Sequence, residues 1–171
     1  MNAADTIAQP DVATTRWRID PSRSTVAFTA TMLWGLSKVT GRFERYEGRL
    51  DLAGWPAVEL TVAAGSITTN IRRRDKHLRS ADFFDAERHP SIRFVSDGAV
   101  LTGDRLVIDG QLHVGGRATP IEAEATLRPV DGELEIEVVA AVDQRLLGIA
   151  RPLVGAPTAL RLTGRLVPEV G

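Results

Sequence analysis

The sequence contains no cysteine, which excludes disulfides, thiolate nucleophiles and cysteine-based metal sites. Aromatic residues make up only 5% of its 171 residues, and the only lysines are Lys38 and Lys76. No apolar run approaches the roughly 18 residues that a transmembrane helix needs. The N-terminal segment lacks the basic and apolar regions of a signal peptide. These absences predict a cytoplasmic protein with no stable membrane insertion.

Several classes of activity also lack their sequence signatures. The net charge is −1, and the one basic cluster has no interleaved stacking aromatics, so we expect no nucleic-acid partner. No GxSxG elbow, Walker loop or Rossmann glycine pattern occurs. The three histidines, His77, His89 and His113, show neither HxH nor HExxH spacing. The sequence therefore predicts no catalytic residue, no metal and no cofactor.

The chain does contain many short segments in which apolar and polar residues alternate, which is typical of half-buried strands. Its length fits one domain, for which we expect a disordered tail over residues 1–15 and a folded domain over 16–171. Residues 32–38 break the alternation and are expected to form a helical turn or plug, and Asp97-Gly98 is expected to be a turn. Eight or nine strands are expected, over residues 17–20, 24–31, 42–52, 57–67, 91–96, 105–114, 118–129, 133–142 and 159–167.

Eight or nine strands linked by short turns predict an antiparallel meander, and closure into a barrel would remove the exposed strand edges. Several of the side chains expected to point inward are small. An eight-stranded barrel has an interior that side chains can just fill, or that can hold one small ligand. The small residues favour a cavity; alternatively, leucine and isoleucine from facing strands fill the space. The small inward residues are Ala30, Ala64, Ala123, Ala125 and Ala140.

The stretch from Ser66 to Asp85 is the exception to this strand pattern, because it combines dense basic charge with helical spacing. We expect Asn70 to cap a helix over residues 71–79, and Ser80 to cap a second short helix that Phe83 and Phe84 dock. In one interpretation the basic residues form a solvated face, and Arg74 and Asp75 tie the insert to the barrel rim. The other makes them an electropositive rim beside an apolar cavity, suited to a lipid with an anionic or polar head.

The segment from Arg74 to Asp85 resembles the RDxHLxSxDFFD signature of the YceI-like family. The resemblance covers residues from about Trp17 to Val167. Further matching motifs are the opening WRIDP of residues 17–21 with Ser24 and Phe28, Gly41-Arg42-Phe43, Ser66-Ile67-Thr68-Thr69, residues 89–94 with Ser96, Gly110 with Leu112, and Thr119-Pro120-Ile121.

This resemblance implies a lipocalin-like, extended eight-stranded antiparallel β-barrel with a short helical insert. It also implies that a long amphiphile, such as a polyisoprenoid or another long-chain lipid, lies in an apolar channel, and that a homodimer can form. The sequence departs from the family pattern before the last loop, where Gln144 occupies the position at which family members often carry arginine, and Arg145 follows it. If that arginine meets the ligand head, the departure puts the head-group selectivity in question.

We expect a non-enzymatic protein that binds, transports or stores such a lipid. One alternative is an enzyme that uses His77 and Asp75 as an acid–base pair on a bound molecule, and another is a structural or stress-response module with a filled barrel. The loop over residues 148–157 is a candidate lid. The candidate ligand-binding residues are Val26, Phe28, Val62, Arg74, His77, Leu78, Phe83, Phe94, Ile108, Leu112, Ile136, Val138 and Leu162.

Overall fold

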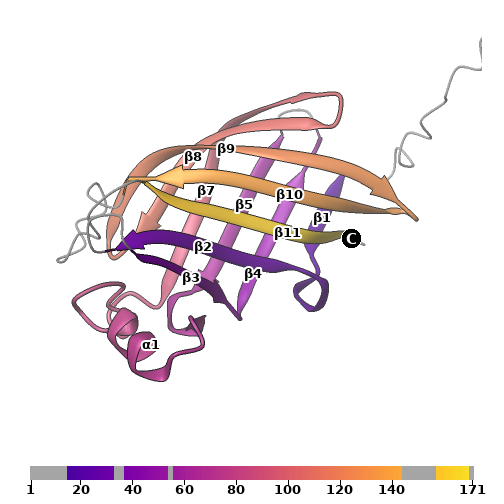
Figure 1. The fold of residues 1–171 in the computed structure, drawn as a ribbon. Helices are drawn as coiled ribbons and strands as arrows, with labels where there is room; N and C mark the ends of the chain where they lie inside the picture. The colour runs from indigo at the N-terminus through magenta and orange to yellow at the C-terminus, as the bar shows by residue number, and fades with distance from the viewer. Residues whose placement is uncertain (1–14, 33–36, 54–55, 144–156, 170–171) are drawn as a thin grey trace, which may run out of the picture.

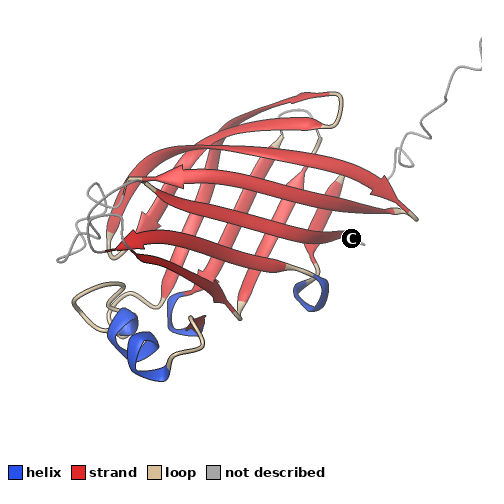
Figure 2. Ribbon diagram, in the orientation of Figure 1, coloured by secondary structure: helices blue, strands red, loops and turns tan. Residues whose placement is uncertain are grey.

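The computed structural model describes residues 15–32, 37–53, 56–143 and 157–169. Most of them lie in antiparallel strands that curve into a barrel, with a small helical insert at one end (Figure 1, Figure 2). The strands are β1 (Arg16–Ile19), β2 (Thr25–Met32), β3 (Ser37–Phe43), β4 (Tyr46–Asp51), β5 (Ala57–Ala63), β6 (Ile67–Thr68), β7 (Ser91–Thr102), β8 (Arg105–Val114), β9 (Arg117–Val130), β10 (Glu133–Val142) and β11 (Thr158–Pro168); the helices are η1 (Pro21–Arg23), η2 (Ala64–Ser66) and α1 (Arg72–Arg79).

Eight of these strands close the barrel. They follow one another in the order β1-β4-β5-β7-β8-β9-β10-β11, and β11 pairs back with β1. The long strand β11 has two partners along one edge, because residues 166–168 pair with β1 and residues 159–163 pair with β2. Strands β3 and β6 continue outward from β2. The arrangement confirms the expected eight-stranded antiparallel barrel with one helical insert.

Alternation places one face of each barrel strand inside. Strands β8 and β10 have the expected bounds, and Leu106, Ile108, Leu112 and Val114 of β8 are all buried. Tight hairpins join these strands to β9. The turn at Gly115-Gly116 has φ values of 58° and 77°. Such positive values are needed in two-residue hairpin turns, and glycine adopts them without steric cost.

The expected single strand over residues 42–52 is wrong, because β3 ends at Phe43 and β4 begins at Tyr46. The chain turns at Glu44-Arg45, where both backbone amides donate to the buried Ser66 Oγ at 3.2 and 3.1 Å. Ser66 lies more than 20 residues along the chain, so no local signal marks this turn. The expected strand over residues 57–67 is also too long, because β5 ends at Ala63 and is followed by η2 and then by β6.

Two other expected irregularities are also replaced by strand. Asp97-Gly98 is not a turn, because β7 runs through it with a register shift between Ser96 and Gly98. A bulge of this kind bends a strand without ending it. Met32 belongs to β2 and Lys38 to β3, so the ends of the expected plug are strand, and its residues 33–36 lie outside the described residues.

Helix α1 begins differently from the expectation. Asn70 does not cap it: its φ is 64°, and the N-cap is Ile71, which has no side-chain capping bond. Ser80 caps no second helix, since residues 80–84 form turns instead. The Ser80 hydroxyl donates to the His77 carbonyl at the C-terminus of α1. Among the described residues, no helix is both long and apolar enough to cross a lipid bilayer.

Several expectations fall on residues outside the described ranges. These are the N-terminal tail over residues 1–14 and most of the loop before the last strand, residues 144–156. Gln144, Arg145 and nearly all of the candidate lid belong to this last segment.

Candidate functional site

The inward faces of the strands enclose an apolar cavity rather than a filled core. It offers about 210 Å³ to the centres of water-sized molecules, whereas one water needs only roughly 10–15 Å³ on this measure. Eleven of the thirteen candidate residues line it, all apolar, from six strands of the barrel region and the insert. They are Val26, Phe28, Val62, Leu78, Phe83, Phe94, Ile108, Leu112, Ile136, Val138 and Leu162.

Small side chains leave this space open on the β9–β10 side. Ala123 and Ala125 of β9 point inward and are buried, and Ala140 of β10 also lines the cavity. Each alanine replaces what would be several carbon atoms of a leucine or isoleucine. The small inward residues seen in the sequence therefore correspond to a real cavity at these positions.

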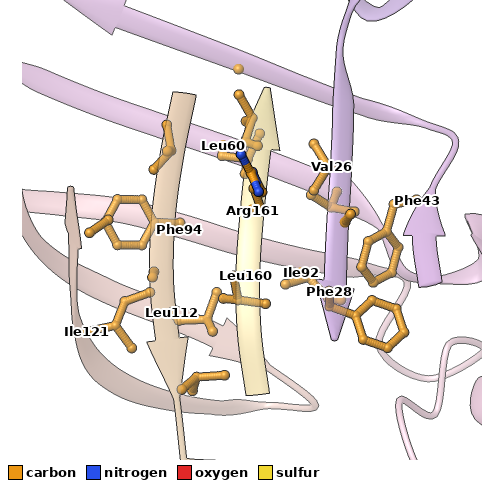
Figure 3. A pocket seen from close by; sticks show the side chains of 18 of the residues that line it. Val26, Phe28, Phe43, Leu60, Ile92, Phe94, Leu112, Ile121, Leu160 and Arg161 are labelled. Atoms are coloured by element: carbon orange, nitrogen blue, oxygen red, sulfur yellow. The ribbon is translucent and has the colours of Figure 1, made fainter. Parts of the chain in front are cut away.

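Two phenylalanine rings pack closely against glycines of the neighbouring strand. A Cβ atom added to Gly41 would come within 2.5 Å of the Phe28 ring, and one added to Gly110 would come equally close to the Phe94 ring. Both rings line the cavity from different sides (Figure 3). Since the glycines have no side chain, each ring can rest against the wall, and the lumen between them stays open.

The insert forms part of the cavity wall. Leu78 of α1 is buried, and Phe83 and Phe84 pack against the core. The Phe84 ring meets the Phe43 ring edge-on at 6.1 Å between centroids, and Phe43 lies 5.8 Å from Phe28. This run of aromatic contacts joins the insert to the barrel wall.

Asp75 anchors the insert. Its side chain is buried, with the residue only 6% exposed. Its Oδ1 accepts from the Thr69 amide at 2.7 Å and the Thr69 hydroxyl at 2.5 Å, and its Oδ2 accepts from the Thr68 hydroxyl at 3.3 Å. Burial alone would raise the pKa of Asp75, but these hydrogen bonds and the nearby Arg79 charge outweigh it and hold the pKa below its usual value.

Arg74 and His77, the two polar candidates, do not line the cavity. The Arg74 guanidinium donates to the Thr69 hydroxyl at 2.8 Å and to the Thr69 carbonyl at 3.1 Å. His77 is half exposed, with its Nε2 3.0 Å from Asp82, and its ring meets Phe83 edge-on. The hypothetical His77–Asp75 pair is therefore wrong, because each residue has a different partner.

Arg74 and His77 instead border a shallow hollow on the outer surface of the insert, together with Ile71 and Arg73. The described residues contain no group of three or more histidine, aspartate or glutamate side chains placed to hold a metal ion.

Other lining residues were not among the candidates, including Leu60, Ile92 and Ile121 (Figure 3). Leu60 and Ile92 follow the same alternation as their candidate neighbours, so the signal for them was present in the sequence. Phe43 was missed for another reason, because the strand containing it was given the wrong bounds.

The sequence matches a known domain family over most of its length. The YceI-like domain model matches residues 17–161. Protein YceI of Escherichia coli O157:H7 is 35% identical over 97 residues, which are 54% of this chain and 51% of that protein, so the chain spans about half the length of the curated relatives it matches.

Solved structures share the fold at low identity. Burkholderia cenocepacia BcnA has a TM-score of 0.78 at 16% identity, over 87% of this chain and 99% of that one. A domain from Saccharophagus degradans described as polyisoprenoid binding has a TM-score of 0.70 at 13% identity, over 91% and 99% of the two chains. With a family model that spans most of its length, the chain belongs to the YceI-like family.

Proposed function

We propose that this protein binds a long-chain amphiphile, a polyisoprenoid or a similar lipid, with the hydrocarbon chain inside the barrel. The observation that carries the proposal is the apolar cavity, whose described lining consists almost wholly of aliphatic and aromatic side chains. Burying a methylene group contributes about 0.8 kcal/mol. A chain of ten buried carbons would thus gain about 8 kcal/mol, before the entropic cost of binding is subtracted.

The Saccharophagus degradans neighbour, which is described as a polyisoprenoid-binding domain, supports the choice of ligand class. The enzymatic alternative needed His77 and Asp75 to act together at the cavity, and neither of them lines it. The filled-barrel alternative is disfavoured by the open interior. Transport or storage remains a prediction. A cytoplasmic location and a homodimer are also predictions; cell fractionation can test the first, and size-exclusion chromatography with light scattering can test the second.

The test is native mass spectrometry of the purified protein, followed by organic extraction and identification of the released compound. We expect a non-covalent adduct with the mass of one long-chain lipid. A protein without any adduct, which also takes up no polyprenyl or acyl chain from a detergent solution, would refute the proposal.

Two neighbouring alanines of β10 provide matched variants. Ala140 lines the cavity, whereas Ala141 is exposed on the opposite face of the same strand. We expect Ala140→Leu to reduce the bound lipid, because three added carbon atoms occupy the cavity, and Ala141→Leu to leave it unchanged. Equal lipid content in the two variants would place the ligand elsewhere.

A further inference from the structure

Helix α1 carries a concentration of positive charge that the rest of the chain does not share. Its eight residues include five cations and one carboxylate, a net charge of +4, while the remaining residues together carry −5 because the whole chain carries −1. The one carboxylate, Asp75, is buried against Thr68 and Thr69. The helix therefore presents only positive charge to solvent.

Three exposed cations of α1 have no polar side-chain partner among the described residues. Arg72, Arg73 and Lys76 are exposed, and none of the three has an ion pair or side-chain hydrogen bond with another described residue. The nearest carboxylates along the chain are already engaged: Asp82 lies against His77, and Asp85 lies against Arg88. Most other arginines on the outer barrel wall do pair with glutamates, as Arg93 does with Glu59 and Arg105 with Glu124, so this insert is different.

An apolar residue accompanies the charges. Ile71, at the start of α1, is 52% exposed and borders the hollow that Arg73 and His77 also line. An exposed isoleucine among unpaired cations is the combination by which peripheral proteins contact anionic bilayers: the cations attract the surface and the apolar group enters the interface.

The insert also lies between solvent and the cavity. Leu78 faces the cavity from one side of α1, while Arg72, Arg73 and Lys76 face solvent, at the end of the barrel where the helix stands apart from the strands (Figure 1). Contact through the outer side of α1 would bring this end of the cavity next to the contacted surface.

We propose that the outer face of α1, formed by Ile71, Arg72, Arg73 and Lys76, is a docking surface for an anionic lipid bilayer. This inference rests on the proposed function, because a protein that carries a long-chain lipid must collect it from, or release it to, a membrane. Docking is reversible and electrostatic, so it weakens as salt screens the charges.

The experiment is flotation of the purified, lipid-loaded protein with vesicles of phosphatidylcholine alone or of phosphatidylcholine and phosphatidylglycerol in equal amounts. We expect binding to the anionic vesicles only, and its loss when the salt is raised from 50 to 500 mM. Arg73→Gln with Lys76→Gln removes two cations and keeps good helix formers in place. We expect this double variant to bind the anionic vesicles about 30-fold more weakly.

The matched control is Arg16→Gln with Arg18→Gln, which changes the net charge equally on β1, away from the insert (Figure 1). We expect it to bind like the unchanged protein. Ile71→Ser should weaken binding while keeping the helix, since serine is a favoured N-cap residue.

Equal losses in both double variants, or equal binding to neutral and anionic vesicles, would overturn the docking surface. So would the absence of any vesicle binding, as expected if the basic face meets an acidic protein instead. Native mass spectrometry of the same samples reports the bound lipid separately, so failure of the docking proposal and failure of the lipid-binding proposal can be told apart.

Discussion

Replacing Asp75 should loosen the insert far more than the rest of the barrel. The carboxylate accepts three hydrogen bonds, and the two from Thr69 are short, at 2.7 and 2.5 Å. Hydrogen bonds to a charged group contribute roughly 1.5–3 kcal/mol each, and a buried donor left without a partner costs about 1–3 kcal/mol. Asp75→Ala should therefore destabilise α1 by about 3–5 kcal/mol. Asp75→Asn retains an acceptor oxygen for Thr69 and should cost about 1–2 kcal/mol.

Amide hydrogen exchange measures this effect at the helix itself. The Asp75 amide donates to the Ile71 carbonyl and the Ser80 amide donates to the His77 carbonyl, so both report on opening of α1. Since 1.4 kcal/mol corresponds to a factor of ten, we expect their protection to fall at least 100-fold in Asp75→Ala and about 10-fold in Asp75→Asn. Asp109→Ala, an exposed aspartate on β8, is the control.

The same carboxylate predicts a dependence on pH. Its pKa is lowered in the folded protein, so its contribution is complete above the ordinary aspartate value near 3.8 and is lost as the pH falls through the folded value. Protection of α1 should thus decline below about pH 4 in the unchanged protein, but not in Asp75→Asn. Protection that is equal in Asp75→Ala and the control would refute the anchoring role.

Three further predictions concern the barrel. Gly41→Ala should displace the Phe28 ring into the cavity, lowering stability by about 1–3 kcal/mol and reducing bound lipid. The control is Gly98→Ala, because Gly98 does not line the cavity and its added carbon would meet nothing within 4 Å; equal lipid content in the two variants would contradict the idea. Ser66→Ala removes the acceptor of two backbone amides and should cost about 1–3 kcal/mol in urea unfolding, so an unchanged midpoint would count against it. Hydrogen bonds from the Ser22 hydroxyl and the Arg23 guanidinium lower the pKa of Asp20 to about 2. The stabilising effect of the Asp20 carboxylate should therefore be full above pH 4 and disappear towards pH 2. If the thermal melting temperature of Asp20→Asn showed the same dependence on acid as that of the unchanged protein, this role of Asp20 would be excluded.

The parts of the fold that sequence reasoning found are those that depend on neighbouring residues alone. Strands β8 and β10 have one face in the lumen and one in solvent, so a period of two marks them from end to end. The same period identifies which side chains point inward, and hence most of the cavity lining. The Gly115-Gly116 and Asp131-Gly132 pairs mark the hairpins that join these strands to β9, because they adopt the positive φ values that the turns need, whereas Asp97-Gly98 lies within β7.

The parts that were missed depend on distant contacts. The turn between β3 and β4 is fixed by Ser66, whose hydroxyl satisfies amides 21 and 22 residues earlier. Asn70 looked like a cap, but Asp75 accepts the Thr69 amide and the chain enters α1 through a left-handed Asn70 instead. No local pattern distinguishes these outcomes, since each depends on which partner a polar group meets in the folded protein.

The YceI-like signature segment acquires a divided role from this geometry. Asp75 and Ser80 hold the insert together. The buried Asp75 carboxylate accepts hydrogen bonds from Thr68 and Thr69, and the Ser80 hydroxyl donates to the His77 carbonyl at the end of α1. Leu78 and Phe83 form part of the cavity wall. Arg74 is committed to Thr69, so it serves to position the insert. A polar ligand head at this end would thus meet the charges only on the outer face, which is why vesicle binding and lipid content are expected to respond to different residues of one short helix.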